Sequence, residues 1–379
     1  MSRSDLHVVL CTDGVFPQAM GGMQRHSRLL AEHLAKREGI RLTVLHPHAE
    51  TVFDPAFGIE ELRIAPIDEG RTYLRELWRY SGRVAEVLDG LAPDVILSQG
   101  FCVWRGIERF SDRLIVHPHG LEMFQGITLK ERAMGSPFRK ILRWIVRRSA
   151  VVVSLGGGLT NILQGLVDGS ACRVVVLPNA VELPAIAPAY PSEDEPVRLL
   201  FVGRFAFNKG IDILLDVARR FSGEGKTDAY AFTLAGDGPE RARMEAEGLP
   251  PNVVLAGKVD DARLEELYAG CHALVLPTRF EGMPTVVLEA MARARPAFVS
   301  DVGATAELVD GGNGLLLPKG DAGALHGALL NFHSLSTTER TVLGEEGRSR
   351  VEERFTWPAV TDGFRDLFRA VAQSATQRE

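Results

Sequence analysis

Two basic side chains, Arg204 and Lys209, stand five residues apart in VGRFAFNKG (202–210), between an apolar run and an amphipathic stretch. This order predicts a strand, a turn and a helix that begins near Gly210. A guanidinium and an ammonium beside a helix N-terminus suit a diphosphate, because free backbone amides and both cations favour negative charge. Spacing alone leaves one alternative open, a solvated loop with two surface cations.

Two carboxylates frame a second segment, RFEGMPTVVLEAMARARP (279–296). Pro284 is expected at the first helical position, which leaves the amides of the next three residues free to meet an anion. Gly282 lets a ligand approach the backbone. Glu289 falls about one turn inside this helix, where vicinal ribose hydroxyls would satisfy it. The alternative is a capping role for Glu281 and a solvent-facing Glu289.

Two loops in the first half of the chain are weaker candidates. Gly21 and Gly22 precede a helix expected from about residue 23, and a glycine pair there can hold phosphate or admit an acceptor. His117 and His119 flank a proline, which disfavours one shared metal ion. The functional interpretation of this segment is that one of the two histidines contacts a sugar hydroxyl or carbonyl group. A flexible glycine turn and a histidine without a role are the alternatives.

These loops all follow short, continuous apolar runs, which are typical of strands buried on both faces of a parallel sheet. Amphipathic stretches alternate with the runs, for example at 23–37, 210–221, 262–271 and 322–332. The repeated alternation predicts two doubly wound α/β domains with ligand sites at the carboxyl ends of strands. The runs occupy 7–14, 41–48, 94–100, 113–120, 150–158, 173–181, 197–204, 231–238, 253–259, 273–278, 296–303 and 314–320.

The length of 379 residues fits two domains, and a proline-rich, acidic hinge lies at 181–198. The predicted domains are 1–185, with a C-terminal helix at 358–379 crossing back to it, and 186–357. Residues 1–190 carry a net charge of +2 and residues 191–379 one of −8. The first half is therefore expected to meet anionic surfaces. No basic stripe is interleaved with aromatic residues, so nucleic-acid binding is not expected.

The four cysteines are widely separated and form no CxxC pair, which favours reduced thiols in the cytoplasm. The N-terminus does not resemble a signal peptide, and the uncharged stretch 149–167 contains three consecutive glycines, so we expect a strand, a loop and a helix there. Residues 129–150 predict a basic amphipathic helix suited to the anionic inner face of the cell membrane. An ordinary helix with one buried face is the alternative.

The motif order resembles family 4 of the retaining glycosyltransferases, also described as glycosyl transferases group 1. VGRFAFNKG is followed by LAGDGPE, EGMPTVVLEAMA, SDVGATAEL and GNGLLL, and GGMQRHS, HPHG and PNAVE precede it. The resemblance covers nearly the whole chain and is most specific at 200–317. It implies the GT-B fold, in which two Rossmann-like doubly wound parallel-sheet domains face each other across a cleft. It also implies transfer of a sugar from a nucleotide donor to a lipid-linked, glycolipid or polysaccharide acceptor.

The same resemblance implies roles for individual residues. Arg204 and Lys209 would contact the diphosphate, Glu281 and His119 the sugar, and Glu289 the ribose. The backbone around Gly282, Met283, Pro284, Thr285 and Val286 would meet the sugar and phosphates. Lys258 and Val259 would contact the base, and Gly21 and Gly22 would line the phosphate and acceptor side. A front-face, retaining reaction without metal or other cofactor is the mechanism that the resemblance favours.

The sequence departs from the family pattern at four positions, and other functions of the same fold are left open. Ala180, Glu182, Pro284 and Arg295 stand where Gly, Asp, Gly and Gly are usual. A same-fold epimerase, hydrolase or phosphorylase, and a silent sugar-nucleotide-binding protein, are the alternatives. The last would be expected to lack Lys209, His119 or Glu281. A nicotinamide dehydrogenase is disfavoured, because GGGLTN (156–161) lacks the GxGxxG spacing. The base, UDP or GDP, and the acceptor stay open.

Overall fold

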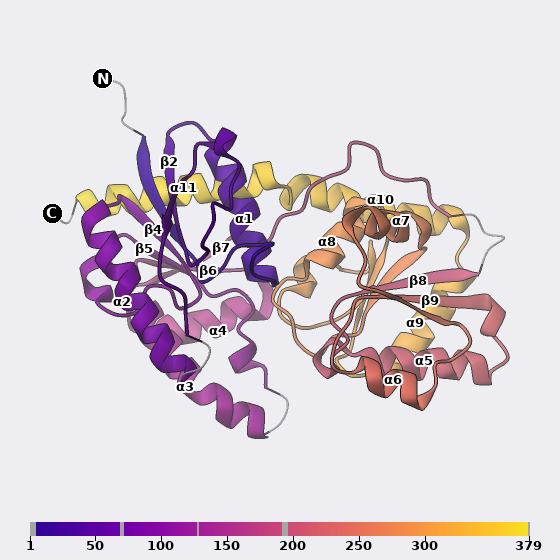
Figure 1. Cartoon of the computed structure of the whole chain (residues 1–379). Helices are drawn as coiled ribbons and strands as arrows, with labels where there is room; N and C mark the ends of the chain where they lie inside the picture. The colour runs from indigo at the N-terminus through magenta and orange to yellow at the C-terminus, as the bar shows by residue number, and fades with distance from the viewer. Residues whose placement is uncertain (1–4, 69–71, 127–128, 192–195, 378–379) are drawn as a thin grey trace. The chain divides into compact units, whose positions relative to one another are not determined.

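The computed structural model describes residues 5–68, 72–126, 129–191 and 196–377. The chain divides into two compact units (Figure 1). Unit 1 comprises residues 1–179 and 357–379, and unit 2 comprises residues 180–356. The sequence placed these boundaries at 185/186 and 357/358.

Unit 1 is built on a seven-stranded sheet with the order β3-β2-β1-β4-β5-β6-β7, in which every neighbouring pair is parallel. The order reverses between β1 and β4. The carboxyl ends of those two strands therefore flank the crevice in which doubly wound sheets bind ligands. The strands are β1 (Leu6–Cys11), β2 (Ile40–His46), β3 (Glu60–Arg63), β4 (Val95–Gln99), β5 (Leu114–His117), β6 (Val151–Ser154) and β7 (Arg173–Val176).

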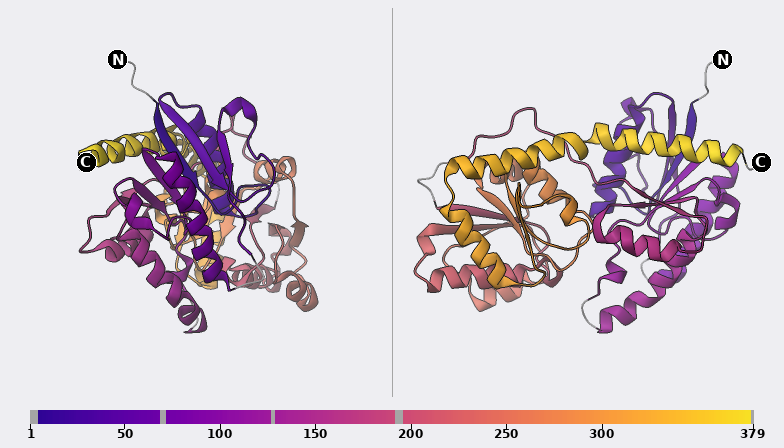
Figure 2. Two further views of the ribbon diagram at one scale, coloured as in Figure 1. Left: turned by 60° about the vertical axis from the view of Figure 1, so that its left-hand side comes forward. Right: turned by 180° about the vertical axis from the view of Figure 1, so that it is seen from behind.

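Helices cover this sheet, and the last helix of the chain is one of them. In Figure 2 it runs, in yellow, alongside the sheet of unit 1. The Arg37 guanidinium donates to Thr361 Oγ1 at 3.0 Å, and the Trp357 ring stacks on His33 at 5.1 Å between centroids. The helices are α1 (Gly22–Ala35), α2 (Tyr73–Leu91), α3 (Leu129–Val146), α4 (Gly157–Val167) and α11 (Trp357–Thr376), with short 3-10 turns η1 (Pro55–Phe57), η2 (Ile107–Phe110) and η3 (Glu122–Phe124).

Unit 2 contains a six-stranded sheet with the order β10-β9-β8-β11-β12-β13, again parallel throughout. Here the order reverses between β8 and β11, so their carboxyl ends mark the expected ligand crevice of this unit. The strands are β8 (Val197–Val202), β9 (Tyr230–Ala235), β10 (Val253–Gly257), β11 (Ala273–Leu276), β12 (Ala297–Ser300) and β13 (Gly314–Leu317).

The helices of unit 2 begin at polar capping residues in several places. Asp260 accepts from Arg263 N at 2.8 Å, Asp321 accepts from Ala324 N at 2.8 Å, and Ser336 forms a capping box with Glu339. The helices are α5 (Ile211–Gly223), α6 (Arg241–Glu247), α7 (Asp261–Gly270), α8 (Thr285–Ala292), α9 (Ala322–Ser334) and α10 (Thr337–Arg354), with η4 (Phe207–Lys209), η5 (Thr227–Ala229) and η6 (Thr305–Glu307).

Both sheets are the α/β architecture that the sequence predicts, and the central strands are buried on both faces. One strand was missed. β3 reads Glu-Glu-Leu-Arg and lies at the edge of its sheet, where charged side chains are tolerated and the apolar run is absent. Within the described residues, no helix combines the length and the apolar character needed to cross a bilayer.

Candidate functional site

The loops after β8 and β11 meet at the reversal point of the unit 2 sheet. Gly210 ends the first loop with φ of +71°, and a Cβ atom there would lie 1.8 Å from the Pro277 carbonyl oxygen. Only glycine permits this approach. Two bonds then join the loops, because Arg279 N and Thr278 Oγ1 both donate to the Asn208 carbonyl, at 2.7 and 2.9 Å.

Arg279 fixes the same two loops through its side chain. Its guanidinium forms a bidentate pair with Asp212, with both N–O distances at 2.7 Å. It also lies 3.8 Å from the centroid of the Phe207 ring and donates to the Phe207 carbonyl at 2.6 Å. A planar guanidinium held on a carboxylate and an aromatic face leaves the loop little freedom.

Lys209 and Glu281 come together as a result. Lys209 Nζ lies 2.5 Å from Glu281 Oε1, although 72 residues separate them in the chain. The carboxylate side chain is only 10% exposed and the lysine side chain 26%. The structure thus places a cation and a carboxylate side by side at the carboxyl edge of the sheet, where a ligand would bridge the two loops.

The loop that follows Glu281 packs against the loop after β12 and is hydrogen-bonded to it. Ala304 N donates to the Gly282 carbonyl at 2.9 Å. A Cβ atom on Gly303, whose φ is +60°, would lie 2.3 Å from the Glu281 carbonyl oxygen. The motif SDVGATAEL therefore supports the backbone of the Glu281 loop, and Met283 is buried beneath it.

Helix α8 begins one residue later than the sequence predicted. Pro284 is its N-cap, with ψ of 114°, and Thr285 is the first helical residue. The Val287 amide already donates to the Pro284 carbonyl at 3.2 Å, so the prediction that it stays free was wrong. The amides of Thr285 and Val286 are the ones left at the helix N-terminus for an anion.

Glu289 is partly buried rather than solvent-facing, and it is held by a tyrosine. Tyr268 Oη donates to Glu289 Oε2 at 2.9 Å and lies 3.3 Å from the Val286 carbonyl oxygen. Tyr268 is itself buried, with the Arg293 guanidinium 5.1 Å from its ring centroid. The carboxylate is therefore oriented before any ligand arrives.

The remaining candidates of unit 2 follow other strands of the same sheet or lie in the loop after β8. Arg204, two residues beyond β8, has an exposed side chain. The exposed Lys258 and the half-buried Val259 follow β10, and β9 separates β10 from β8 in the sheet. Their predicted contacts with the diphosphate and the base stay predictions.

In unit 1, α1 begins at Gly22, one residue earlier than predicted, with Gly21 as its N-cap. Both glycines are exposed. A Cβ atom on Gly22 would meet no atom within 4 Å, whereas one on Gly21 would lie 2.2 Å from Gln24 Oε1. The helix N-terminus is therefore open at Gly22, as a ligand-binding role requires.

His119 is half-buried and packs against two buried histidines, His26 and His117, at the same edge of the unit 1 sheet. Its φ is +60°, which is rare for a residue with a side chain. Its ring stacks on His117 at 3.9 Å between centroids, and His26 lies edge-on at 5.2 Å. Burial, and secondarily the neighbouring His26, hold the pKa of His119 well below its usual range. The imidazole is neutral at pH 7.

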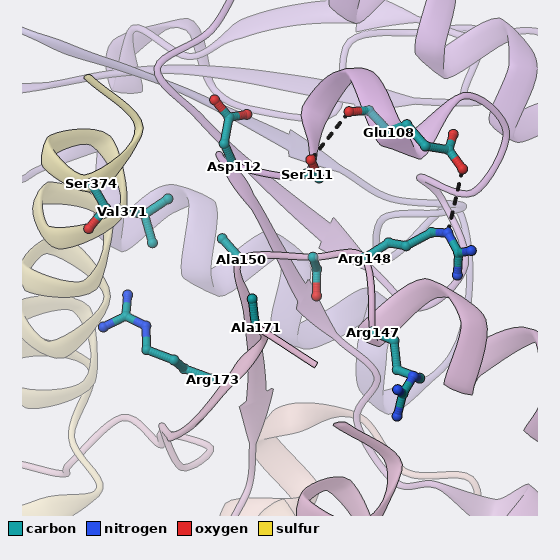
Figure 3. A pocket seen from close by; sticks show the side chains of 11 residues that line it. Glu108, Ser111, Asp112, Arg147, Arg148, Ala150, Ala171, Arg173, Val371 and Ser374 are labelled. Carbon is teal, nitrogen blue, oxygen red and sulfur yellow. Dashed lines mark hydrogen bonds and ion pairs between the residues drawn. The ribbon is translucent and has the colours of Figure 1, made fainter. Parts of the chain in front are cut away.

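A cavity of about 360 Å³ opens at the opposite edge of the same sheet (Figure 3). It lies beside the amino ends of β6 and β7, and two of the three arginines that line it are already engaged. Arg147 donates to the Leu166 and Gly169 carbonyls at 3.4 and 3.3 Å, and Arg148 lies 3.5 Å from a Glu108 oxygen. Ligands of doubly wound sheets bind at the other edge, so this cavity is not the candidate site.

Two family models match adjacent parts of the chain. The model described as Glycosyltransferase Family 4 matches residues 20–184, and the one described as Glycosyl transferases group 1 matches residues 196–334. The chain belongs to the group 1, family 4 glycosyltransferases. The second model contains Arg204, Lys209, Glu281 and Glu289, and the first contains Gly22 and His119.

Individual relatives agree with this membership. This chain is 30% identical over 177 residues to an uncharacterized glycosyltransferase of Methanocaldococcus jannaschii, an alignment that covers 46% of this chain and 48% of the relative. It is 31% identical over 183 residues to O-antigen chain mannosyltransferase C of Escherichia coli, covering 46% and 47%. The chain thus spans about half the length of these curated relatives.

The fold extends over the whole chain. Sucrose-phosphate synthase from Thermosynechococcus elongatus superimposes with a TM-score of 0.81 at 20% identity, covering 97% of this chain and 99% of that structure. Together with the two parallel sheets, this likeness shows the GT-B fold.

Several residues of the glycosyltransferase site escaped the sequence interpretation. The Arg279–Asp212 pair fixes the loop that carries Lys209, and Tyr268 orients Glu289. Each of these three residues looks like an ordinary loop or helix residue in the sequence. Gln99, whose Oε1 lies 2.5 Å from His119 Nε2, is different, because it ends strand β4 at the carboxyl edge and could have been noticed. Among the described residues, no group of three or more His, Cys, Asp or Glu side chains could hold a metal ion.

Proposed function

We propose that this chain is a retaining, metal-independent glycosyltransferase that moves a sugar from a nucleotide-sugar donor to a lipid-linked, glycolipid or polysaccharide acceptor. The contact between Lys209 and Glu281 at the reversal point of the unit 2 sheet is the observation that carries the proposal. It joins a cation suited to phosphate and a carboxylate suited to sugar hydroxyls at the point where doubly wound sheets bind ligands.

Negative charge grows on the nucleoside diphosphate as the glycosidic bond breaks. In our proposal Lys209, Arg204 and the free amides of Thr285 and Val286 stabilise that charge, since all of them follow β8 or β11 at the carboxyl edge of the sheet. Their combined effect would stand in for a metal ion. Glu281 would hold the transferring sugar, and the leaving phosphate would help to deprotonate the acceptor on the same face.

The remaining contacts follow from position along the edge of each sheet. Glu289 would accept hydrogen bonds from the ribose hydroxyls, because its carboxylate is already oriented by Tyr268. The backbone of Lys258 and Val259 would meet the base. Gly22, with Gly21, would line the acceptor side, and His119 would hydrogen-bond the sugar.

The names of relatives support the donor and acceptor classes. One similar structure, at 16% identity and a TM-score of 0.70, was solved in complex with UDP. Others are named as an O-antigen mannosyltransferase and a lipopolysaccharide outer core galactosyltransferase. We therefore propose a cytoplasmic enzyme that acts in surface-glycan or glycolipid synthesis.

A panel of UDP-, GDP- and other nucleotide sugars tests this function. We expect one donor to raise the melting temperature of the protein. We also expect the protein to release the nucleoside diphosphate from that donor at a rate that an excess of EDTA leaves unchanged. Loss of activity with EDTA would refute the metal-independent reaction. Thermal stabilisation without turnover, with any acceptor, would favour the silent binding protein, and an epimerised product would favour the epimerase.

Glu289→Ala should weaken binding of the free nucleoside diphosphate by roughly 10- to 100-fold, because a carboxylate that accepts from two hydroxyls is lost. Isothermal titration calorimetry measures the change. Tyr268→Phe should have a smaller effect in the same direction, since it frees the carboxylate without removing it. Glu266→Ala, on the exposed surface of α7, is the control. Unchanged affinity in Glu289→Ala would exclude the ribose role.

We also propose that α3 contacts an anionic membrane. Leu129 is 83% exposed and Met134 66%, and Lys140 and Arg143 are exposed on the same helix. In flotation with phosphatidylserine vesicles, Lys140→Gln combined with Arg143→Gln should reduce bound protein roughly tenfold or more. Lys226→Gln with Arg263→Gln is the charge-matched control. Arg147 is left intact, because its bonds to the Leu166 and Gly169 carbonyls are structural. Undiminished binding would contradict the membrane contact.

A further inference from the structure

Gln99 is the last residue of β4 and lies at the reversal point of the unit 1 sheet. Its side chain is completely buried, and it stands in register with His117 on the neighbouring strand β5. Its amide oxygen lies 2.5 Å from His119 Nε2. The sequence interpretation did not name this residue, and the membership in the family does not assign it a role.

The other neighbours of His119 do not hydrogen-bond its ring. His117 stacks face to face on it, with 21° between the planes, and both of its own ring nitrogens are buried without a hydrogen-bond partner in the described part of the chain. His26 approaches edge-on, and its Nε2 is likewise buried and unpaired there. Gln99 is thus the contact that decides which nitrogen of His119 carries the proton.

A neutral imidazole has one N–H and one lone pair, and an amide oxygen can only accept. With Gln99 Oε1 facing it, Nε2 carries the proton and donates it, while Gln99 Nε2 is buried without a hydrogen-bond partner among the described residues. This leaves Nδ1 of the partly exposed His119 ring as an acceptor. The backbone at His119, with φ of +60°, sets the direction of the ring, and such strained conformations persist where the surrounding contacts hold them.

We propose that Gln99 is a positioning residue that locks His119 in the Nε2–H tautomer, so that Nδ1 presents a lone pair to a hydroxyl group of the transferring sugar. This inference rests on the proposed function for the identity of the ligand. It makes His119 a hydrogen-bond acceptor toward the sugar, and it excludes His119 as a proton donor to the leaving group.

Nuclear magnetic resonance of the full chain labelled with ¹⁵N-histidine tests the tautomer without any substrate. Two-bond ¹H–¹⁵N correlations at pH 7 should show a protonated Nε2 and an unprotonated Nδ1 for His119, assigned by its absence in His119→Ala. A protonated Nδ1 in the wild-type protein would overturn the proposal. This readout stands even if no nucleotide sugar is turned over, so it separates failure of this inference from failure of the proposed function.

Gln99→Met removes the acceptor while keeping the volume. We expect mixed His119 tautomers and a kcat for donor turnover lowered roughly tenfold, with an unchanged Kd for the free nucleotide. Gln99→Glu keeps an acceptor and should retain the Nε2–H tautomer, with most of the activity restored. If Gln99→Met kept a single Nε2–H tautomer and full kcat, the proposal would be wrong. If it did not fold, the wild-type spectrum alone would decide.

Ser98→Ala is the matched control, on the adjacent buried position of the same strand. Its hydroxyl accepts from Val103 N at 3.1 Å and does not touch His119. This variant should lose stability without changing the His119 tautomer or the kcat. A shifted tautomer in Ser98→Ala would show that general loosening of β4, rather than the Gln99 contact, sets the proton position.

Discussion

Replacing Lys209 with alanine should lower the turnover number by a factor of about 100 or more, because it removes a cation from the point where charge develops on the leaving diphosphate. The ammonium is fixed by Glu281 Oε1 at 2.5 Å and by the Gly210 turn, so no other side chain can move into its place without rebuilding the loop. Steady-state release of the nucleoside diphosphate from the donor found in the panel measures the change.

The matched control is Lys226→Ala, which removes a lysine of the same unit whose side chain is 41% exposed and whose Nζ lies 2.9 Å from a Glu224 oxygen. Its turnover should equal that of the wild-type protein. Lys209→Ala and Glu281→Gln should be strongly non-additive, since the two side chains touch and each orients the other. Near-normal turnover in Lys209→Ala would show that the lysine does not stabilise the leaving diphosphate, and it would remove the main support for the proposed function.

Most of the fold could be predicted from sequence because both sheets are parallel and covered on both faces. Such strands read as continuous apolar runs, and those before Gly203 and Pro277 are examples. The edge strand β3 could not be found this way, since three of its four residues, Glu60, Glu61 and Arg63, are charged. The start of α8 was misplaced by one residue, because Pro284 fits both an N-cap and a first helical position.

The candidate site was predictable in its residues but not in their contacts. Spacing indicated Lys209 and Glu281 separately, and only the family resemblance implied that the loops carrying them meet at one donor. Their direct contact follows from the strand order, which places β8 beside β11. The supports of the site were missed for the same reason, since Arg279 and Asp212 are 67 residues apart and only the fold brings them together.

Arg295 has the largest expected effect on stability. Its side chain is completely buried, and its guanidinium donates to carbonyl oxygens, among them Tyr268 at 3.0 Å, Ala269 at 2.8 Å and Ala189 at 2.8 Å. The Tyr190 ring lies 5.3 Å away. Burial lowers the pKa of Arg295. Arg295→Met should destabilise unit 2 by about 3–5 kcal/mol, because the buried carbonyls lose their donors.

Calorimetry should show the unit 2 transition lowered by roughly 10 °C. Arg263→Met, at an exposed arginine on α7, should leave it within a few degrees. Arg295→Lys should also destabilise, since one ammonium cannot replace a planar fork of donors. A wild-type melting temperature in Arg295→Met would show that the buried charge is replaceable by an apolar side chain of similar volume, as some buried ion pairs are.

The same variant connects stability to nucleotide binding. Arg295 Nε bonds the backbone of Tyr268, and the Tyr268 hydroxyl holds Glu289. Loss of the guanidinium should therefore weaken affinity for the free nucleotide by a few-fold at temperatures where unit 2 is still folded, because Glu289 loses its preset orientation. Combining Arg295→Met with Tyr268→Phe should add little to that loss. Full additivity would instead show that Arg295 acts on the fold alone.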